Sequence, residues 1–139
     1  MKKLLLIINA VLGAILSAVP FVLFPVCSNL KPDGIPMNCF YSGIFITIMG
    51  VLIVIFSLIA LQKKLFLFSN LLSLICALMC WLVPNEIIRL SGTGWACSLC
   101  GNPEHACRAS TMQSVIILIS LIIILNFAVL LINFVKGNN

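Results

Sequence analysis

Four long apolar stretches take up most of this chain, and they limit what it can fold into. They cover residues 4–26, 41–61, 65–84 and 114–135 and contain no charged side chain. At about 1.5 Å of rise per residue, each is close to the roughly 20 residues that a helix needs to cross a bilayer. Lipid offers no hydrogen-bond partners, so the backbone N–H and C=O groups of a membrane span must bond to each other. Only helices and closed barrels satisfy this requirement. The unbroken apolar run 114–125 lacks the alternation of barrel strands, which favours helices.

Composition supports the same class of protein. The chain has 139 residues, of which 63% are hydrophobic and 8% are charged, and this is not the composition of a soluble domain. Too few residues remain outside the apolar stretches for a separate soluble catalytic domain. We therefore predict a single integral membrane domain over residues 1–139, an all-α four-helix transmembrane bundle. Its external loops would be residues 27–40 and 85–113.

The basic residues predict how the bundle is oriented. Two loops carry as many acidic as basic residues, whereas the termini and the middle turn carry only basic ones, namely Lys2, Lys3, Lys63, Lys64 and Lys136. The positive-inside rule then places both termini and the turn 62–64 in the cytoplasm, an N-in/C-in topology. The net charge of +5 is thus a topology signal. No basic patch with aromatic residues indicates nucleic-acid binding.

The first span also has features of a secretory signal peptide. Lys2 and Lys3 precede an apolar run that contains the small residues Ser17 and Ala18. The run continues to residue 26, however, which is longer than a typical signal core. The residues before Cys27 are not the small ones that a lipoprotein signal requires. We expect an uncleaved membrane anchor.

The two halves follow one plan, which suggests two repeated helical hairpins. Each half has a helix ending near a proline (Pro25, Pro84), a loop with cysteines and a returning helix. Such a parallel repeat implies a pseudo-two-fold axis along the membrane normal. Within the spans, small residues at helical spacing mark the expected packing faces. These are Ala10, Ala14 and Ala18 beside Asn9, Gly13 and Ser17; then Gly43, Thr47, Gly50 and Ser57; then Ser69, Ser73, Cys76 and Cys80.

The last span is the least patterned, and its polar residues are informative. It has few small residues, so it is the helix expected to face lipid or a partner protein. Asn126 and Asn133 are costly in lipid unless they are paired, so both should face protein. We favour hydrogen bonds within the bundle over contacts with a partner.

Five of the seven cysteines fall in the predicted external loops, where oxidising conditions allow disulfides to persist. The turn sequence Pro32-Asp33-Gly34 would bring Cys27 and Cys39 together. A bridge between them would contribute up to roughly 3 kcal/mol in the chain-entropy model. In the second loop Cys107 can pair with Cys100 or with Cys97, leaving one thiol over. Pairs between the loops also remain open.

Cys97 and Cys100 form a CxxC pair, the clearest chemical motif in the chain. Such a pair can cycle between dithiol and disulfide. Four spans with an external CxxC are similar in topology to quinone-linked disulfide oxidases and vitamin K epoxide reductases. CxxC also occurs often in structural settings. The pair Cys76 and Cys80, one helical turn apart inside a span, is best explained by packing.

A metal site is a further alternative. Cys97, Cys100, His105 and Cys107 offer the sulfur and imidazole ligands that zinc accepts. Met37 and Cys39 could add soft ligands for Cu(I). His105 is the only histidine, and a single loop histidine is usually solvated. We therefore expect no bound metal or other cofactor.

The order of the loop features resembles a bacterial family of four-pass membrane proteins catalogued as domain of unknown function 4418. The matching segments are Phe24-Pro25-Val26-Cys27, Asp33-Gly34, Met37-Asn38-Cys39, Ser42-Gly43, Cys100-Gly101-Asn102-Pro103, Cys107-Arg108 and Thr111. Family members commonly have histidine and methionine where this chain has Phe40 and His105, which weakens a metal role. The resemblance makes Cys97 an extra cysteine and favours a Cys100–Cys107 bridge.

The resemblance implies four helices, external disulfides and no known activity. Members are often encoded near ABC transporters of the macrolide-exporter type, which suggests an accessory subunit. The chain also lacks nucleophile–base pairs, paired carboxylates and nucleotide motifs. We expect a non-enzymatic protein of the bacterial cytoplasmic membrane that assists or regulates a transporter. Its expected partners are the lipid bilayer and an ABC permease, or a second copy of itself. The alternatives are a thiol–disulfide oxidoreductase using Cys97 and Cys100, and an external metal-handling protein.

Overall fold

The computed structural model describes residues 2–26, 34–62, 65–93, 95–99 and 107–137. The α-helices in these ranges are α1 (Lys2–Ala18), α2 (Asn38–Ile59), α3 (Phe66–Leu82) and α4 (Met112–Gly137). Two π-helical turns accompany them, η1 (Val19–Leu23) after α1 and η2 (Cys107–Thr111) before α4. A short antiparallel hairpin lies between α3 and α4 and consists of β1 (Ser91–Gly92) and β2 (Trp95–Ala96). The predicted helical fold is confirmed.

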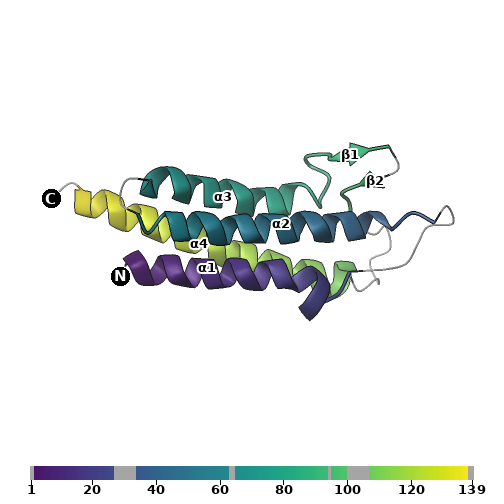
Figure 1. Cartoon of the computed structure of the whole chain (residues 1–139), viewed down its shortest axis with the longest axis horizontal. Helices are drawn as coiled ribbons and strands as arrows, with labels where there is room; N and C mark the ends of the chain where they lie inside the picture. The colour runs from purple at the N-terminus through teal and green to yellow at the C-terminus, as the bar shows by residue number, and fades with distance from the viewer. Residues whose placement is uncertain (1, 27–33, 63–64, 94, 100–106, 138–139) are drawn as a thin grey trace.

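The four helices run alternately in opposite directions and form a bundle (Figure 1). Each helix contacts its two neighbours in the ring α1–α2–α3–α4. Both chain ends, the end of α2 and the start of α3 lie at one end of the bundle, here called the terminal end (Figure 1). The hairpin and the starts of α2 and α4 lie at the opposite end, here called the hairpin end.

The lengths of the helices suit a membrane. The helices Lys2–Leu23, Asn38–Ile59 and Arg108–Val135 are each long and apolar enough to cross one, so the prediction of transmembrane helices is confirmed for these. Helix α3 is also apolar but has 17 residues, the lower end of the usual range for a span.

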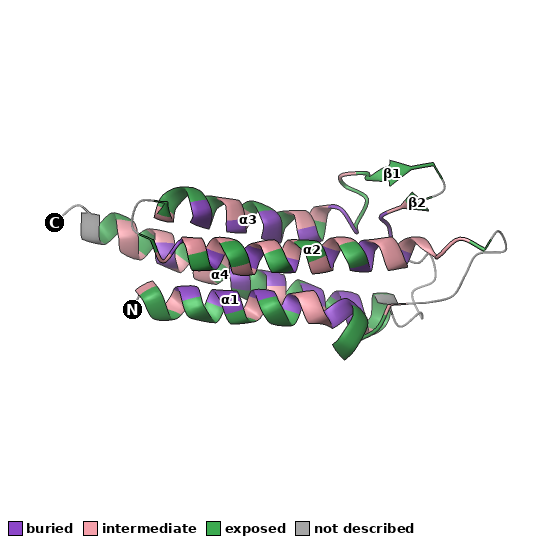
Figure 2. Cartoon of the chain, in the orientation of Figure 1, coloured by how far each residue is buried: buried purple, intermediate pink, exposed green. Residues whose placement is uncertain are grey.

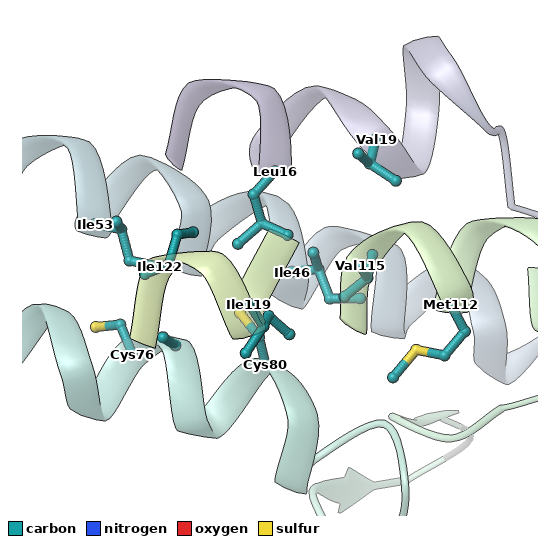
Figure 3. Close-up of a cluster of buried hydrophobic side chains, with 11 residues drawn as sticks. Leu16, Val19, Ile46, Ile53, Cys76, Cys80, Met112, Val115, Ile119 and Ile122 are labelled. Carbon is teal, nitrogen blue, oxygen red and sulfur yellow. The ribbon is translucent and has the colours of Figure 1, made fainter. Parts of the chain in front are cut away.

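Burial follows the pattern of a protein that sits in lipid. The faces of the helices that meet are buried, while the outward faces are exposed and still apolar (Figure 2). A central cluster draws side chains from all four helices, among them Leu16, Ile46, Cys76 and Ile119 (Figure 3). Because lipid is as apolar as these side chains, close packing rather than a hydrophobic driving force holds such helices together.

Helices α1 and α2 pack closely against each other at Gly13 and Gly50. A Cβ atom on Gly50 would lie 2.7 Å from the backbone nitrogen of Ser17 and 2.9 Å from the carbonyl oxygen of Gly13. Nearby, the hydroxyl of Thr47 donates to the carbonyl oxygen of Ser17 over 3.1 Å. The predicted packing stripe through Gly13 and Ser17 is therefore confirmed. The neighbouring alanine stripe is not the packing face along its whole length, because Ala14 is exposed.

Proline explains why α1 does not continue as a regular helix. Pro20 has no N–H to bond to the preceding turn, and the chain widens there into the π-helical turn η1. The N–H of Phe24 bonds to the carbonyl oxygen of Val19 over 2.9 Å, and the N–H of Val26 bonds to that of Pro20 over 2.9 Å. The end of this segment bends away from the bundle axis (Figure 1).

Helix α3 ends in a tight turn just before the hairpin. The N–H groups of Ile87 and Ile88 both bond to the carbonyl oxygen of Leu82, at 3.1 and 3.3 Å. Between them and the helix, Glu86 adopts a φ of 58°, a left-handed conformation that side chains with a Cβ disfavour. The chain then turns back so that β2 contacts α2.

Candidate functional site

The segment that follows the hairpin, residues 97–99, is hydrogen-bonded to the first turns of α2. The side-chain amide of Asn38 donates to the hydroxyl of Ser98 over 3.1 Å. The hydroxyl of Ser42 donates to the carbonyl oxygen of Ser98, also over 3.1 Å. Asn38 and Ser42 are four residues apart and so share one helix face. The N–H of Cys97, just after β2, bonds to the carbonyl oxygen of Leu90, just before β1, over 2.8 Å, which joins the two ends of the hairpin.

A chain of aromatic rings continues this attachment. The indole ring of Trp95 lies against Gly92, where a Cβ atom would collide with it. Trp95 also contacts Tyr41 at 5.9 Å between ring centroids. Phe40 lies 6.2 Å from Tyr41 and 5.6 Å from Phe21 of η1, measured in the same way. The rings thus link the hairpin to α2 and α2 to η1.

A further hydrogen bond at the hairpin end joins η2 to the residue that follows η1. The hydroxyl of Thr111, the last residue of η2, donates to the carbonyl oxygen of Phe24 over 2.9 Å. This bond joins the start of the α4 region to the end of the α1 region. The segment 95–98 and the ends of η1 and η2 are therefore each held to a neighbouring element by specific contacts.

The predicted chemical residues are only partly placed. Cys39 and Cys97 are buried, with 1% and 6% of their surfaces exposed. Cys27, Cys100 and His105 lie outside the described residues, as does the side chain of Cys107, whose backbone begins η2. The predicted bridges Cys27–Cys39 and Cys100–Cys107 therefore stay predictions. So do the redox pair Cys97/Cys100 and the metal set that adds His105 and Cys107 to it.

The described part of the site gives little support to thiol chemistry. Cys97 is a free thiol, and burial raises its pKa above the ordinary value. A redox-active cysteine needs the opposite shift, because the thiolate is the reactive form. Among the described residues, no three His, Cys, Asp or Glu side chains gather in a way that could hold a metal ion.

Cys76 and Cys80 behave as apolar packing residues. Both are free thiols on the inner face of α3, buried in the central cluster beside Ile119 and Ile122 of α4 (Figure 3). This agrees with the packing role expected from their spacing along the helix.

Polar residues inside the bundle form a second site, which the sequence predicts only in part. Asn126 donates to the side-chain oxygen of Asn9 over 3.4 Å, and Asn133 accepts a hydrogen bond from Lys2 over 2.7 Å. Internal hydrogen bonds for both α4 asparagines are thus confirmed. Asn70 was missed, although it is buried in α3 and donates to the carbonyl oxygen of Asn126 over 3.2 Å. A polar amide in an otherwise apolar span is the signal that would have identified it.

Neither a curated protein nor a solved structure matches the chain. One family model does match, and its description is "Domain of unknown function (DUF4418)". The match covers residues 9–133, from within α1 to within α4, and includes both the hairpin end and the buried polar residues. The chain belongs to this family of proteins with a domain of unknown function.

Proposed function

We propose that the protein is a four-pass protein of the bacterial cytoplasmic membrane with both termini in the cytoplasm. In this role it is a non-enzymatic subunit that assists or regulates a membrane transporter, of the ABC type by its resemblance. The arrangement of charge supports the orientation. Lys2 and Lys3 lie at the terminal end, and the sequence of the turn after α2 adds Lys63 and Lys64.

Chain connectivity supports a fourth crossing. Helix α2 ends at the terminal end and α4 begins near the hairpin end, so the chain between them must cross the bundle (Figure 1). Helix α3 makes this crossing and contacts both α2 and α4. Its 17 residues extend about 25 Å, a few ångströms less than the usual hydrocarbon thickness. Trp81, near its end, is exposed and suits the membrane–water interface.

The observation that best supports an accessory role is a group of exposed apolar side chains at the hairpin end, on a segment that is anchored to the bundle. Ile87, Leu90 and Trp95 are exposed on the segment that follows α3, with 59% of the surface of Ile87 exposed. The same segment is anchored to α2 through Ser98 and the ring of Tyr41. Apolar side chains held in place outside the helices suit a contact with another protein.

Disulfides would add to this rigidity. We propose the bridges Cys27–Cys39 and Cys100–Cys107, each joining a loop to the start of a helix region. Cys39 lies in the first turn of α2, and Cys107 is the first residue of η2. A bridge at either place would fix the loop relative to the bundle.

The oxidoreductase alternative is less well supported. Its first cysteine, Cys97, is buried and has a raised pKa, so little of it is thiolate at neutral pH. A direct assay separates the two functions. Purified protein supplied with a dithiol donor should not reduce quinone. Activity that is lost in Cys97→Ser would overturn the non-enzymatic proposal.

Site-specific photo-cross-linking tests the accessory role. A photoreactive residue at Ile87, with 59% of its surface exposed, should cross-link to a transporter permease in native membranes. The matched control is the same residue at Leu67, which has 57% exposure but lies in the first turn of α3, at the opposite end of the bundle. The proposal predicts a permease adduct at Ile87 and none at Leu67. Equal adducts at both positions, or none at Ile87, would contradict it.

A further inference from the structure

Polar side chains from all four helices meet inside the bundle, away from the hairpin end. They form a polar cluster of five residues, each with at most 2% of its surface exposed: Asn9, Ser57, Asn70, Ser73 and Asn126. The amide nitrogen of Asn9 donates to the hydroxyl oxygens of Ser57 and Ser73, at 2.9 and 3.3 Å. Asn126 and Asn70 complete the cluster through α4, as described above.

Two oxygen atoms in the polar cluster have no hydrogen-bond partner among the residues that the structure describes. They are the side-chain carbonyl oxygens Oδ1 of Asn70 and Oδ1 of Asn126, and both are buried. In a low-dielectric interior an unsatisfied carbonyl oxygen is costly, and nearly all buried polar atoms in folded proteins have a partner. The cluster thus has more acceptors than its own donors satisfy.

The orientation of the amides is fixed by their surroundings. The amide nitrogen of Asn126 donates to the carbonyl oxygen of Ile122 over 2.7 Å and to the side-chain oxygen of Asn9 over 3.4 Å. Turning this amide over would place its oxygen against two other oxygens. The amide nitrogen of Asn70 likewise faces the carbonyl oxygen of Asn126. Exchanging the oxygen and nitrogen positions of either side-chain amide would therefore not give the two oxygens hydrogen-bond partners.

Apolar side chains close the polar cluster on both sides along the bundle axis. Toward the terminal end lie Leu6, Ala60 and Val129, each one turn beyond a member of the cluster. Toward the hairpin end lies the central cluster, including Ile53 and Ile122. A molecule bound between these layers would be isolated from bulk water and from lipid.

We propose that the polar cluster is a binding site for internal water, which donates hydrogen bonds to Asn70 Oδ1 and Asn126 Oδ1. The ligand must be a hydrogen-bond donor, because the unsatisfied atoms are acceptors. A water molecule has two protons to donate and typically makes about three hydrogen bonds when buried. It can accept its third from the second amide proton of Asn70, which bonds to no other residue in the described part of the chain. A metal cation would also suit oxygen ligands, but the five side chains are neutral and none offsets a buried charge.

Such water would hold the four helices in one register. Asn9, Ser57, Asn70 and Asn126 come from different helices, and the bound water would connect α3 to α4 where direct bonds are few. The site would be part of the folded bundle and would form only when the helices are correctly aligned.

Nuclear magnetic resonance of the purified protein in micelles tests the proposal. With selectively ¹⁵N-labelled asparagine, the side-chain amides of Asn70 and Asn126 should show rotating-frame cross-peaks to water whose sign indicates proximity rather than proton exchange. In Asn70→Leu, the cross-peak at Asn126 should be lost. The control Ser120→Ala changes an exposed residue of α4 and should leave the cross-peaks intact.

Two further outcomes would overturn the proposal. One is the absence of water cross-peaks at both amides in the unmodified protein, a result that does not depend on how well Asn70→Leu folds. The other is a melting temperature that rises specifically in sodium or potassium chloride relative to choline chloride at equal ionic strength, which would assign a cation to the site. The proposal predicts the same melting temperature in all three salts.

Discussion

Replacing Gly50 with alanine should separate α1 from α2. The added Cβ would lie 2.7 Å from the nitrogen of Ser17, which is 0.7 Å short of the 3.4 Å at which ordinary contact begins. The nearest atoms are all backbone atoms of Ser17 and Gly13, so no side chain can rotate out of the way. The helices must therefore move apart, and the hydrogen bond from Thr47 to the carbonyl oxygen of Ser17 would be strained as well.

The size of the effect follows from two opposing terms. Overpacking of a tight interface costs about 1–3 kcal/mol, and replacing glycine by alanine inside a helix returns up to about 1 kcal/mol. We expect Gly50→Ala to lower the free energy of unfolding by about 1–2 kcal/mol. The matched control is Gly43→Ala, where the three atoms nearest to the new Cβ are side-chain atoms of Val26, Pro20 and Phe21 at 3.1 to 3.4 Å. The nearest, on Val26, can rotate away, and the other two lie close to ordinary contact distance. The small remaining cost is offset by the gain in helix propensity, so the control should change the free energy of unfolding by less than about 0.5 kcal/mol.

Unfolding in detergent, followed by tryptophan fluorescence, measures both variants under the same conditions. Trp81 and Trp95 lie away from the helix crossing at Gly50 and report on the end of α3 and on the hairpin. Gly50→Ala should be clearly less stable than Gly43→Ala. If the two variants are equally stable, the close crossing of α1 and α2 at Gly50 is refuted.

Three other predictions concern the hairpin end. Because burial raises the pKa of Cys97, folded protein keeps this proton at pH values where an unfolded thiol has lost it. The contribution of this thiol to the free energy of unfolding should be complete below pH 9.0, the ordinary pKa of cysteine, and should decrease as the pH rises further. The free energy of unfolding should therefore fall between about pH 8 and pH 10, and Cys97→Ser should remove the part of this fall that comes from the thiol. Glu86→Gly should raise the free energy of unfolding by about 0.5–1 kcal/mol, because glycine adopts the left-handed conformation at little cost; no change in thermal unfolding would refute this. Cys27→Ser should lower stability by up to roughly 3 kcal/mol if the Cys27–Cys39 bridge forms, and non-reducing peptide mapping that finds Cys27 alkylated would refute the bridge.

Much of the helical architecture could be predicted because its causes are local. Apolar runs without charge define α1, α2 and α4. The small residues spaced with Gly13 in α1 and with Gly50 in α2 mark where these two helices pack closely. Spacing alone did not separate this stripe from the alanines beside it, since adjacent faces of one helix look alike in sequence. Ala14 is exposed because α2 packs against the neighbouring face of α1, which contains Gly13.

The parts that could not be predicted depend on contacts between distant residues. The strands β1 and β2 have two residues each, too few to produce an alternating pattern. The attachment of Ser98 to Asn38 joins residues 60 positions apart. Asn70 carried a usable signal as an amide within an apolar span, but its bond to the backbone of Asn126 arises only when α3 packs against α4.

A four-pass topology requires the two ends of α3 to lie on opposite sides of the membrane, which can be measured directly. Gln62 and Thr93 are exposed residues that flank α3 on either side. Cysteine placed at each position, in separate variants, can be treated with a membrane-impermeant maleimide in intact cells and located by peptide mass spectrometry. A four-pass topology predicts labelling of Thr93→Cys from outside, and labelling of Gln62→Cys only after the cells are opened. Labelling of both positions from outside, or of neither, would show that α3 does not cross the membrane.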